Sequence, residues 1–255
     1  MIRKALLIEA GKAKGQKEIA GPAVDVSRLR TWFGSENGGA WEQGEIATLS
    51  NPSPAQVQAS VTGLAGADYA FVSFSGHGYI EQDARTGRQT QKIIVGTGEE
   101  MNFASLRPSV KKVLMMCDAC RVVEVVRRFA ESSLIENRLK LAGKKYDRAA
   151  FREWFEAAVT NAAEGAFTMY GCGVNQVCYD DPLEGGFFTS SLIDSAAGWT
   201  DRVAKNGCLP AQDALTLAAG AVSVRTAGKS PPQQPTGGPE NRTLGNPFPF
   251  AVRLI

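Results

Sequence analysis

Short, continuous runs of hydrophobic residues alternate along this chain with stretches in which hydrophobic residues recur at helical spacing. Continuous runs bounded by polar or glycine-rich sequence are typical of strands that are buried on both faces of a sheet. Such runs occupy residues 5–8, 69–74, 113–116 and 166–170, and further strands are predicted at 45–49 and 248–255. Helical spacing and helix-start signals predict helices near 24–33, 54–64, 150–164, 187–197 and 210–224.

Strands that alternate with helices predict an α/β fold, in which three layers (α/β/α) enclose a mostly parallel sheet of about six strands. A chain of 255 residues fits one large domain of this class. Two stretches look irregular: 228–246, which is rich in Gly, Pro and Gln, and the highly charged 121–148. Because ligands bind at the carboxyl ends of the strands in such sheets, the residues after each apolar run are the first candidates for chemistry.

Composition and charge narrow the function classes. The 44% hydrophobic and 21% charged residues exclude a disordered chain, a coiled coil and a collagen-like fibre. A net charge of +2 gives no argument for a nucleic-acid partner. No apolar run is long enough to predict a membrane span, and the apolar run near the N-terminus is too short for the core of a signal peptide. The five cysteines show no disulfide or metal-ligand spacing, which predicts reduced thiols and a cytoplasmic location.

The only histidine, His77, lies in the motif Ser-Gly-His-Gly at 75–78, directly after the second strong apolar run. The motif Cys-Asp-Ala-Cys-Arg at 117–121 follows the third run. A lone histidine or cysteine is more often a structural residue than a catalytic one. If these two strands are neighbours, however, both motifs meet at one edge of the sheet, where an imidazole can activate a thiol for attack on a carbonyl carbon. This arrangement favours His77 and Cys120 as a catalytic pair.

The segment 71–78, Phe-Val-Ser-Phe-Ser-Gly-His-Gly, resembles the histidine strand of caspases and metacaspases. Residues 118–121, Asp-Ala-Cys-Arg, resemble their nucleophile motif. Weaker similarities extend over nearly the whole chain, at 5–8 and 21–25 near the start, at 185–189 before a small-subunit helix, and at 233–235 near the C-terminus. The resemblance is to caspase/metacaspase-like cysteine peptidases of the bacterial caspase-fold type, and it implies the caspase–hemoglobinase fold.

The resemblance implies a thiol protease in a single domain, 1–255. A large-subunit-like part would span about 1–125, a linker about 126–148, and a small-subunit-like part about 149–255. Cys120 would be the nucleophile and His77 the general base and acid. The backbone amides of Gly78 and Cys120 would form the oxyanion hole. No cofactor and no metal ion is implied for this chemistry.

By the same resemblance, Asp25, Ser75 and Asp118 would line the pocket for the substrate residue before the cleaved bond. Two carboxylates and a hydroxyl would pair with Arg or Lys and repel Asp. The expected substrate is therefore a protein or peptide with a basic residue at this P1 position. Asp25 has an alternative role as the N-terminal cap of the helix near 24–33, a place where Asp is favoured.

The charged stretch 121–148 occupies the place of the linker between the two caspase subunits. An enzyme with basic specificity would cleave there, which predicts a zymogen that is activated by self-processing or by an upstream protease. The candidate processing sites are Arg138, Lys140, Lys144, Lys145 and Arg148.

The chain departs from the family in two ways. Val122 follows Arg121, where the family usually has glycine. Calcium-dependent metacaspases carry an aspartate-rich segment beyond the histidine motif, whereas Glu81, Asp83 and the pair at 99–100 are scattered here. Because calcium sites gather several oxygen ligands, calcium dependence is not expected.

Two other function classes stay open. Residues 117–120 are formally Cys-x-x-Cys, the spacing of a thiol–disulfide redox protein, although His77 has no role in that reading. A non-catalytic caspase-like interaction module is the second alternative, because fold does not fix function. Bacterial proteins of this type also suggest, by analogy alone, a role in cell death or antiviral defence.

Overall fold

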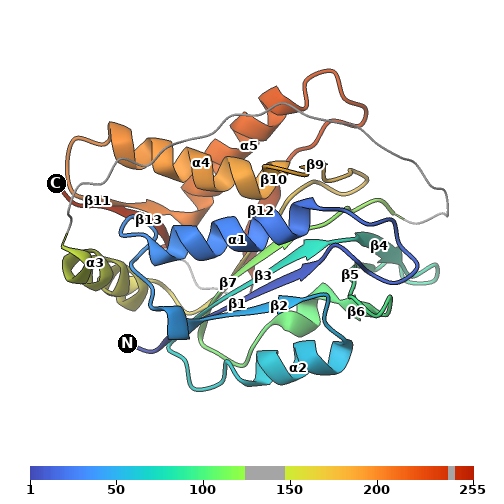
Figure 1. Ribbon diagram of the computed structural model, residues 1–255, viewed down its shortest axis with the longest axis horizontal. Helices are drawn as coiled ribbons and strands as arrows, with labels where there is room; N and C mark the ends of the chain where they lie inside the picture. Colours follow the sequence, from blue (N-terminus) through green and yellow to red (C-terminus); the bar gives the residue numbers. More distant parts are fainter. Residues whose placement is uncertain (124–146, 241–244) are drawn as a thin grey trace.

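The computed structural model describes residues 1–123, 147–240 and 245–255, and its centre is a six-stranded sheet between layers of helices (Figure 1). The strand order is β12-β8-β7-β3-β1-β2; β12 is antiparallel to β8, and the other neighbours are parallel. The strands are β1 (Arg3–Ala10), β2 (Ile46–Ser50), β3 (Tyr69–Gly76), β7 (Lys112–Asp118), β8 (Gly165–Tyr170) and β12 (Thr236–Glu240). This confirms the α/β architecture with a mostly parallel sheet.

Helices pack on both faces of the sheet. The face with more helices carries α1 (Gly21–Gly34), α3 (Arg148–Asn161), α4 (Phe187–Arg202) and α5 (Ala211–Arg225), and the other face carries α2 (Pro54–Thr62) (Figure 1). Side chains of successive strand residues alternate between two cores, with Leu7 and Phe71 in the first and Leu6 and Val72 in the second. Burial on both faces explains why these strands read as continuous apolar runs. None of the helices described is long and apolar enough to span a bilayer.

The predicted irregular segment 228–246 contains a strand, so that expectation is wrong for residues 236–240. The strand β12 lies at the edge of the sheet, where Pro239 can be tolerated because an edge strand leaves some of its amides unpaired. A Cβ at Gly237 would lie 2.5 Å from the Thr168 carbonyl oxygen, so the close approach to β8 requires glycine. Its composition of Gly and Pro carries no strand signal, which is why only the pairing reveals it.

Two smaller sheets complete the fold. The first contains β4 (Gly78–Gln82), β5 (Gln89–Ile94) and β6 (Glu100–Asn102), and leads through the short helix η2 (Phe103–Leu106) towards β7. In the second, β11 (Gly207–Pro210) pairs with β13 (Pro249–Arg253), so the predicted C-terminal strand exists but lies outside the central sheet. The three-stranded sheet begins one residue after His77 and therefore borders the region where β3 and β7 end.

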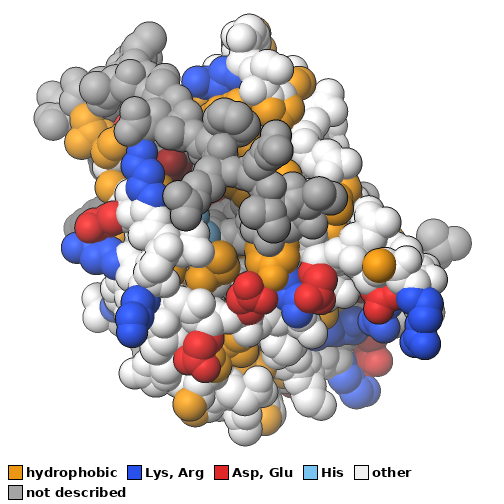
Figure 2. All heavy atoms as spheres, turned by 90° about the vertical axis from the view of Figure 1, so that its right-hand side faces the viewer, with side chains coloured by type: hydrophobic (Ala, Val, Ile, Leu, Met, Phe, Trp, Pro, Cys, Tyr) orange, Lys and Arg blue, Asp and Glu red, His pale blue; other side chains and the backbone are white. Residues whose placement is uncertain are grey.

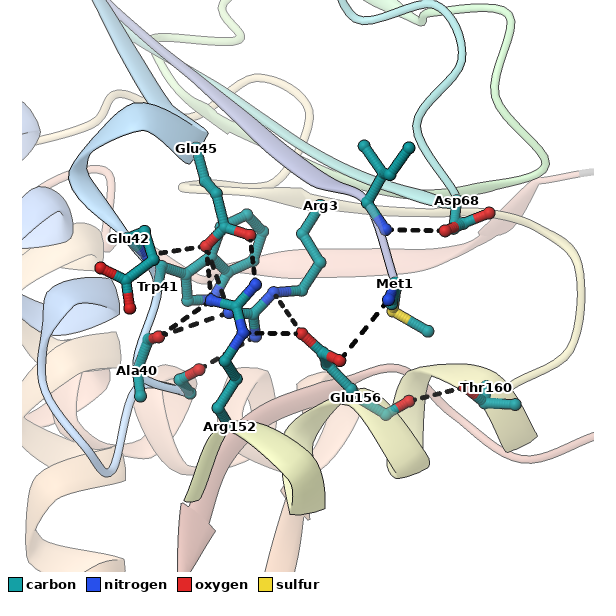
Figure 3. Close-up of polar contacts among 12 residues, drawn as sticks. Met1, Arg3, Ala40, Trp41, Glu42, Glu45, Asp68, Arg152, Glu156 and Thr160 are labelled. Atoms are coloured by element: carbon teal, nitrogen blue, oxygen red, sulfur yellow. Dashed lines mark hydrogen bonds and ion pairs between the residues drawn. The ribbon is translucent and has the colours of Figure 1, made fainter. Parts of the chain in front are cut away.

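Charged residues at the amino ends of the strands form a buried network (Figure 3). The Arg3 side chain is fully buried, and its guanidinium lies 3.3 Å from Glu45 and stacks 4.6 Å from the Trp41 ring centroid. Arg152 of α3 binds Glu45 at 2.7 Å and Glu156 at 3.0 Å. Glu45 ends the short helix η1 (Gln43–Glu45). The network joins β1, η1 and α3, and thereby ties the first half of the chain to the second.

Candidate active site

The two catalytic candidates lie at equivalent positions on neighbouring strands. In the parallel pair β3–β7, Ser75 is opposite Asp118. His77 and Cys120 each follow two residues later, so the pairing places both at the carboxyl edge of the sheet. Both side chains are half-buried, and the pale blue histidine is visible on the face shown in Figure 2. The two strands are therefore neighbours, which is the condition under which the sequence predicts that the His77 and Cys120 motifs meet.

The imidazole of His77 is oriented by the loop between β1 and α1. Its Nε2 lies 2.7 Å from the carbonyl oxygen of Lys17. A carbonyl oxygen only accepts, so Nε2 carries a proton in this contact and a neutral ring keeps Nδ1 as its basic nitrogen. The loop is closed on itself by the bond from the Ile19 amide to the Gly11 carbonyl oxygen (3.0 Å). Lys17 thus contributes to the site through its backbone, which no residue-type signal in the sequence could indicate.

The Cys120 thiol is held by the segment that follows β8. The amide of Cys178 donates to Cys120 Sγ at 3.4 Å. Burial raises the pKa of Cys120 to about 12, and the charge of Asp118 adds to this, while the bond from the Cys178 amide works against it. Within the part of the chain that the structure describes, no hydrogen bond joins the thiol to His77. The Cys120 thiol is therefore neutral at rest and would need a base to become a nucleophile.

The Gly78 amide points towards the segment that contains Cys120. Ile94 donates to the His77 carbonyl oxygen at 3.0 Å, so the next residue, Gly78, is in a position whose amide points away from β5. Two residues on, the amide of Ile80 donates to the Val122 carbonyl oxygen at 2.9 Å. Alternate amides along a strand point the same way, so the Gly78 amide also faces the nucleophile segment. This direction is the one that an oxyanion donor requires.

Two carboxylates are buried close to Cys120. Asp25, in the second turn of α1, accepts from Ser75 Oγ at 2.5 Å and from the amide of Gly186 at 2.7 Å. Asp118, the last residue of β7, accepts from the hydroxyl and the amide of Thr189 at 2.7 and 3.0 Å. The alternative role of Asp25 as a helix cap is wrong, because α1 begins four residues earlier and its N-cap makes no side-chain bond. The fold brings Asp25, Ser75 and Asp118 together.

Within the described residues, no cation neutralises the two carboxylates. Burial raises the pKa of Asp25 well above its ordinary value, and the charge of Asp118 raises it further. Burial also raises the pKa of Asp118, although the bonds from Thr189 oppose this. Within the described residues, no salt bridge reaches either carboxylate. A cation that enters here would meet two desolvated carboxyls, would favour their ionised forms and would pair with them.

A family model for the caspase domain matches residues 2–237 of this sequence. The chain belongs to the caspase-domain family of cysteine peptidases. Caspase-1 from Spodoptera frugiperda superposes with a TM-score of 0.55 over 93% of this chain and 85% of that one, at 11% identity, which shows the shared fold. No curated protein matches the sequence.

Two segments of this caspase domain complete the pocket without having been predicted as site residues. The strands β9 (Asp180–Asp181) and β10 (Gly185–Gly186) form a hairpin before α4, and a Cβ at Gly186 would lie 2.4 Å from an Asp118 oxygen. Thr189, in the first turn of α4, binds Asp118 directly. Asp180 adds a third, partly exposed carboxylate that raises the pKa of Asp25. The glycine pair at 185–186 carried a weak family resemblance, and the close contact explains why glycine is needed there.

Most of the proposed linker lies outside the described residues, as do Arg138, Lys140, Lys144 and Lys145. Arg148 is the first residue of α3, and its guanidinium donates to the carbonyl oxygens of Gly34 (2.5 Å) and Trp41 (2.7 Å). Cleavage after Arg148 would therefore require the first turn of α3 to unwind. Arg148 is therefore poorly suited to a protease that binds extended peptides.

The structure does not favour a redox role for the spacing Cys117-x-x-Cys120. Cys117 is fully buried within β7 and packs in the second core, and both thiols are free. Burial also raises the pKa of Cys117 well above its ordinary value, which suppresses its thiolate. This agrees with its interpretation as an apolar thiol at the end of a buried strand.

Proposed function

We propose that this caspase domain is a cysteine endopeptidase that cleaves peptide bonds after Arg or Lys. The observation that carries the proposal is the pair of buried carboxylates, Asp25 and Asp118, next to Cys120 and without a cation within the described residues. Burying like charges without a partner costs stability, so a ligand of opposite charge is the natural complement. The guanidinium of Arg fits two carboxylates through its forked donors, and Lys fits as a point charge.

The reaction follows from the side chains at the carboxyl edge. His77 Nδ1 takes the Sγ proton of Cys120, and the sulfur forms a bond to the scissile carbonyl carbon. The amides of Gly78 and Cys120 donate to the oxyanion. When the C–N bond breaks, His77 returns the proton to the leaving amine. Water, deprotonated by His77, then attacks the thioester and releases the acid and the free thiol.

The hydrogen bond from His77 to the Lys17 carbonyl oxygen suits this role, because it stabilises the imidazolium that forms after proton transfer. It also explains how a buried thiol with a pKa of about 12 can react at neutral pH. Substrate brings the nucleophile and the base into a shared, water-poor site, where transfer of the proton is coupled to attack.

The test is a panel of otherwise identical fluorogenic peptides with Arg, Lys, Asp or Ala at P1. We expect the wild-type protein to cleave the Arg and Lys peptides, and Cys120→Ala to cleave none. Cys117→Ala serves as the matched thiol control and should retain activity if it folds. Preference for the Asp peptide would refute the pocket assignment. Absence of cleavage, together with no covalent adduct from a peptidyl-Arg chloromethylketone, would favour the non-catalytic alternative.

Activation and biology are part of the same proposal. A protease with this specificity can cleave basic residues in the stretch 126–148, either in itself or in another copy, and an upstream protease could do the same. Intact wild-type protein after prolonged incubation with substrate, alongside intact Cys120→Ala, would exclude self-processing. Independence from calcium, a cytoplasmic location and a role in bacterial cell death or antiviral defence remain predictions from the sequence.

A further inference from the structure

The peptide group between Ala119 and Cys120 is held by thiols from a distant segment. Cys178 Sγ donates to the Ala119 carbonyl oxygen at 3.2 Å, and Cys172 Sγ lies 3.6 Å from the same atom. A trans peptide is planar, with its C=O and N–H on opposite sides. Fixing the Ala119 carbonyl oxygen therefore fixes the direction of the Cys120 N–H, which is the second proposed oxyanion donor.

The Cys178 thiol stays protonated and can therefore donate a hydrogen bond at neutral pH. Burial raises its pKa well above the ordinary value, and its neighbours Cys172 and Asp118 raise it further, so it keeps its proton at neutral pH. The same residue also donates its backbone amide to Cys120 Sγ at 3.4 Å. Cys178 thus contacts both reacting parts of Cys120, the sulfur and the peptide group that precedes it.

The next peptide group is held from the opposite side by Gln91 of β5. Gln91 is buried, and its Nε2 donates to the Cys120 carbonyl oxygen at 3.2 Å and to the Lys92 carbonyl oxygen at 2.9 Å. Its Oε1 accepts from Arg121 Nε at 3.0 Å. The N–H of that same peptide, on Arg121, donates to the Gln176 carbonyl oxygen at 3.0 Å. Both ends of this peptide plane are therefore fixed.

The segment that supplies Cys172 and Cys178 is itself anchored at its ends. The buried side chain of Gln233 donates to the Gly171 carbonyl oxygen at 2.8 Å and accepts from the Tyr179 amide at 3.0 Å. These bonds join the two flanks of the segment 172–178 through one side chain. The thiols of this segment therefore have defined positions relative to the Ala119 carbonyl oxygen.

We propose that Gln91 and Cys178 are positioning residues that hold the two peptide planes on either side of Cys120 and so aim its N–H into the oxyanion hole. The inference rests on the proposed peptidase function for its kinetic consequence, but the orientation of the peptide planes is independent of that function. Neither side chain needs to touch the substrate, and each acts through the backbone of the nucleophile.

The first test replaces Gln91 by Glu, which keeps the shape and the acceptor for Arg121 but removes the donor to the Cys120 carbonyl oxygen. We expect kcat for an Arg peptide to fall about tenfold to 100-fold with KM nearly unchanged. A misdirected N–H stabilises the oxyanion less well, so it costs part of the rate that complete removal of the donor would cost. Gln89→Glu is the matched control on the same strand. Gln89 is exposed and bonds only Gln82 among the described contacts, so its variant should retain wild-type kinetics.

The second test compares Cys178→Ala with Cys178→Ser. Alanine removes the donor to the Ala119 carbonyl oxygen, whereas serine keeps an O–H that can restore it. We expect kcat to fall in the alanine variant and to recover in the serine variant. Because Cys178 also lies near the Asp118 carboxyl and lowers its pKa, KM for Arg peptides is followed separately in this pair. Cys208→Ala, in β11, is the matched thiol control and should leave kcat unchanged.

A readout that does not depend on activity decides the orientation itself. Crystal structures of Gln91→Glu and Cys178→Ala should show the peptide groups next to Cys120 rotated away from their wild-type direction, with the serine variant restored. Unmoved peptide planes together with unchanged kcat would overturn the positioning role. If the wild-type protein cleaves no peptide at all, the proposed function fails, and the crystal structures alone still confirm or overturn the positioning.

Discussion

Two clusters of buried charge lie at opposite ends of the central sheet, and they differ in how their charges are balanced. At the amino end, the Arg3 guanidinium meets Glu45 and lies close to Glu156, and Arg152 binds both of these carboxylates (Figure 3). At the carboxyl end, Asp25 and Asp118 lie next to each other with hydroxyl and amide donors around them. Among the described residues, cations pair with the carboxylates of the first cluster, whereas no cation pairs with those of the second.

The pKa values follow this difference. Burial alone would raise the pKa of Glu45, but the bond from Arg152 and the charge of Arg3 bring it below its ordinary value. At the other end, burial raises the pKa of both Asp25 and Asp118. The charge of Asp118 raises the pKa of Asp25 further. The difference has two causes: Glu45 is only partly buried and has cations as neighbours, whereas Asp25 and Asp118 are fully buried and have each other.

The comparison separates a structural role from a functional one. A network whose charges are paired within the chain holds elements together and gains nothing from a ligand. A pair of buried carboxylates without a cation among the described residues costs folding free energy that a bound cation can recover. The first cluster can therefore be altered without changing substrate choice, and the second without losing the fold.

Replacing Asp118 by Asn should give the largest effect. The amide keeps an acceptor for the two Thr189 donors but removes one charge from the pocket. We expect kcat/KM for Arg peptides to fall about 10³-fold, close to 4 kcal/mol of transition-state stabilisation. The midpoint of urea unfolding at neutral pH should stay the same or rise, because a repulsive buried charge is lost. Equal loss on peptides with neutral P1 residues would contradict a role in specificity.

The opposite change is Glu45→Gln at the amino end. Among the described residues, it leaves the fully buried Arg3 with the more distant Glu156 as its one carboxylate partner. We expect a loss of about 2 to 3 kcal/mol in the free energy of unfolding, measured by urea titration, with unchanged P1 preference. Glu164→Gln is the control, since its pair with Lys111 is exposed and should contribute less than about 0.5 kcal/mol. A shift in P1 preference without destabilisation would reverse the assigned roles.

Much of the carboxyl-edge site was predictable from sequence because it follows directly from strand ends. Buried strands read as apolar runs, and the residues that follow two of them, His77 and Cys120, are placed by parallel pairing. The pocket residues Asp25 and Asp118 came from family resemblance rather than from any local pattern. Their proximity depends on α1 packing over the sheet, which no spacing in the sequence encodes.

The parts that could not be predicted act through the backbone or through isolated side chains. Lys17 contributes a carbonyl oxygen, which every residue possesses, so its identity gives no signal. Gln91 and Cys178 belong to no motif, and only the three-stranded sheet and the segment after β8 bring them to the nucleophile. The amino-end network also gives no signal in the sequence, because nothing distinguishes Arg3 and Glu45 from ordinary surface charges.

The dependence of ligand binding on pH gives the smallest effect but the most direct measure of the unpaired charges. Because folding raises the pKa of Asp25 and Asp118, these two carboxyls hold more protons in the folded protein than in the unfolded chain above the ordinary carboxyl pKa of 3.8. Their contribution to the stability of the free protein should therefore fall as pH rises from that value through the raised pKa values. A cation needs ionised carboxylates, so its binding should release protons and tighten with increasing pH.

Benzamidine binding to Cys120→Ala isolates this linkage, since no covalent step can follow. We expect affinity to rise by at most about tenfold per pH unit for each proton released. Calorimetry in buffers of different ionisation enthalpy measures that proton release directly. Asp118→Asn in the same background should bind more weakly and with a flatter pH dependence, because one titrating carboxyl is gone. Affinity that is independent of pH, without proton release, would mean that both carboxylates are already ionised in the free protein. The two clusters would then differ in the number of cations beside their carboxylates, and not in the pKa values of those carboxylates.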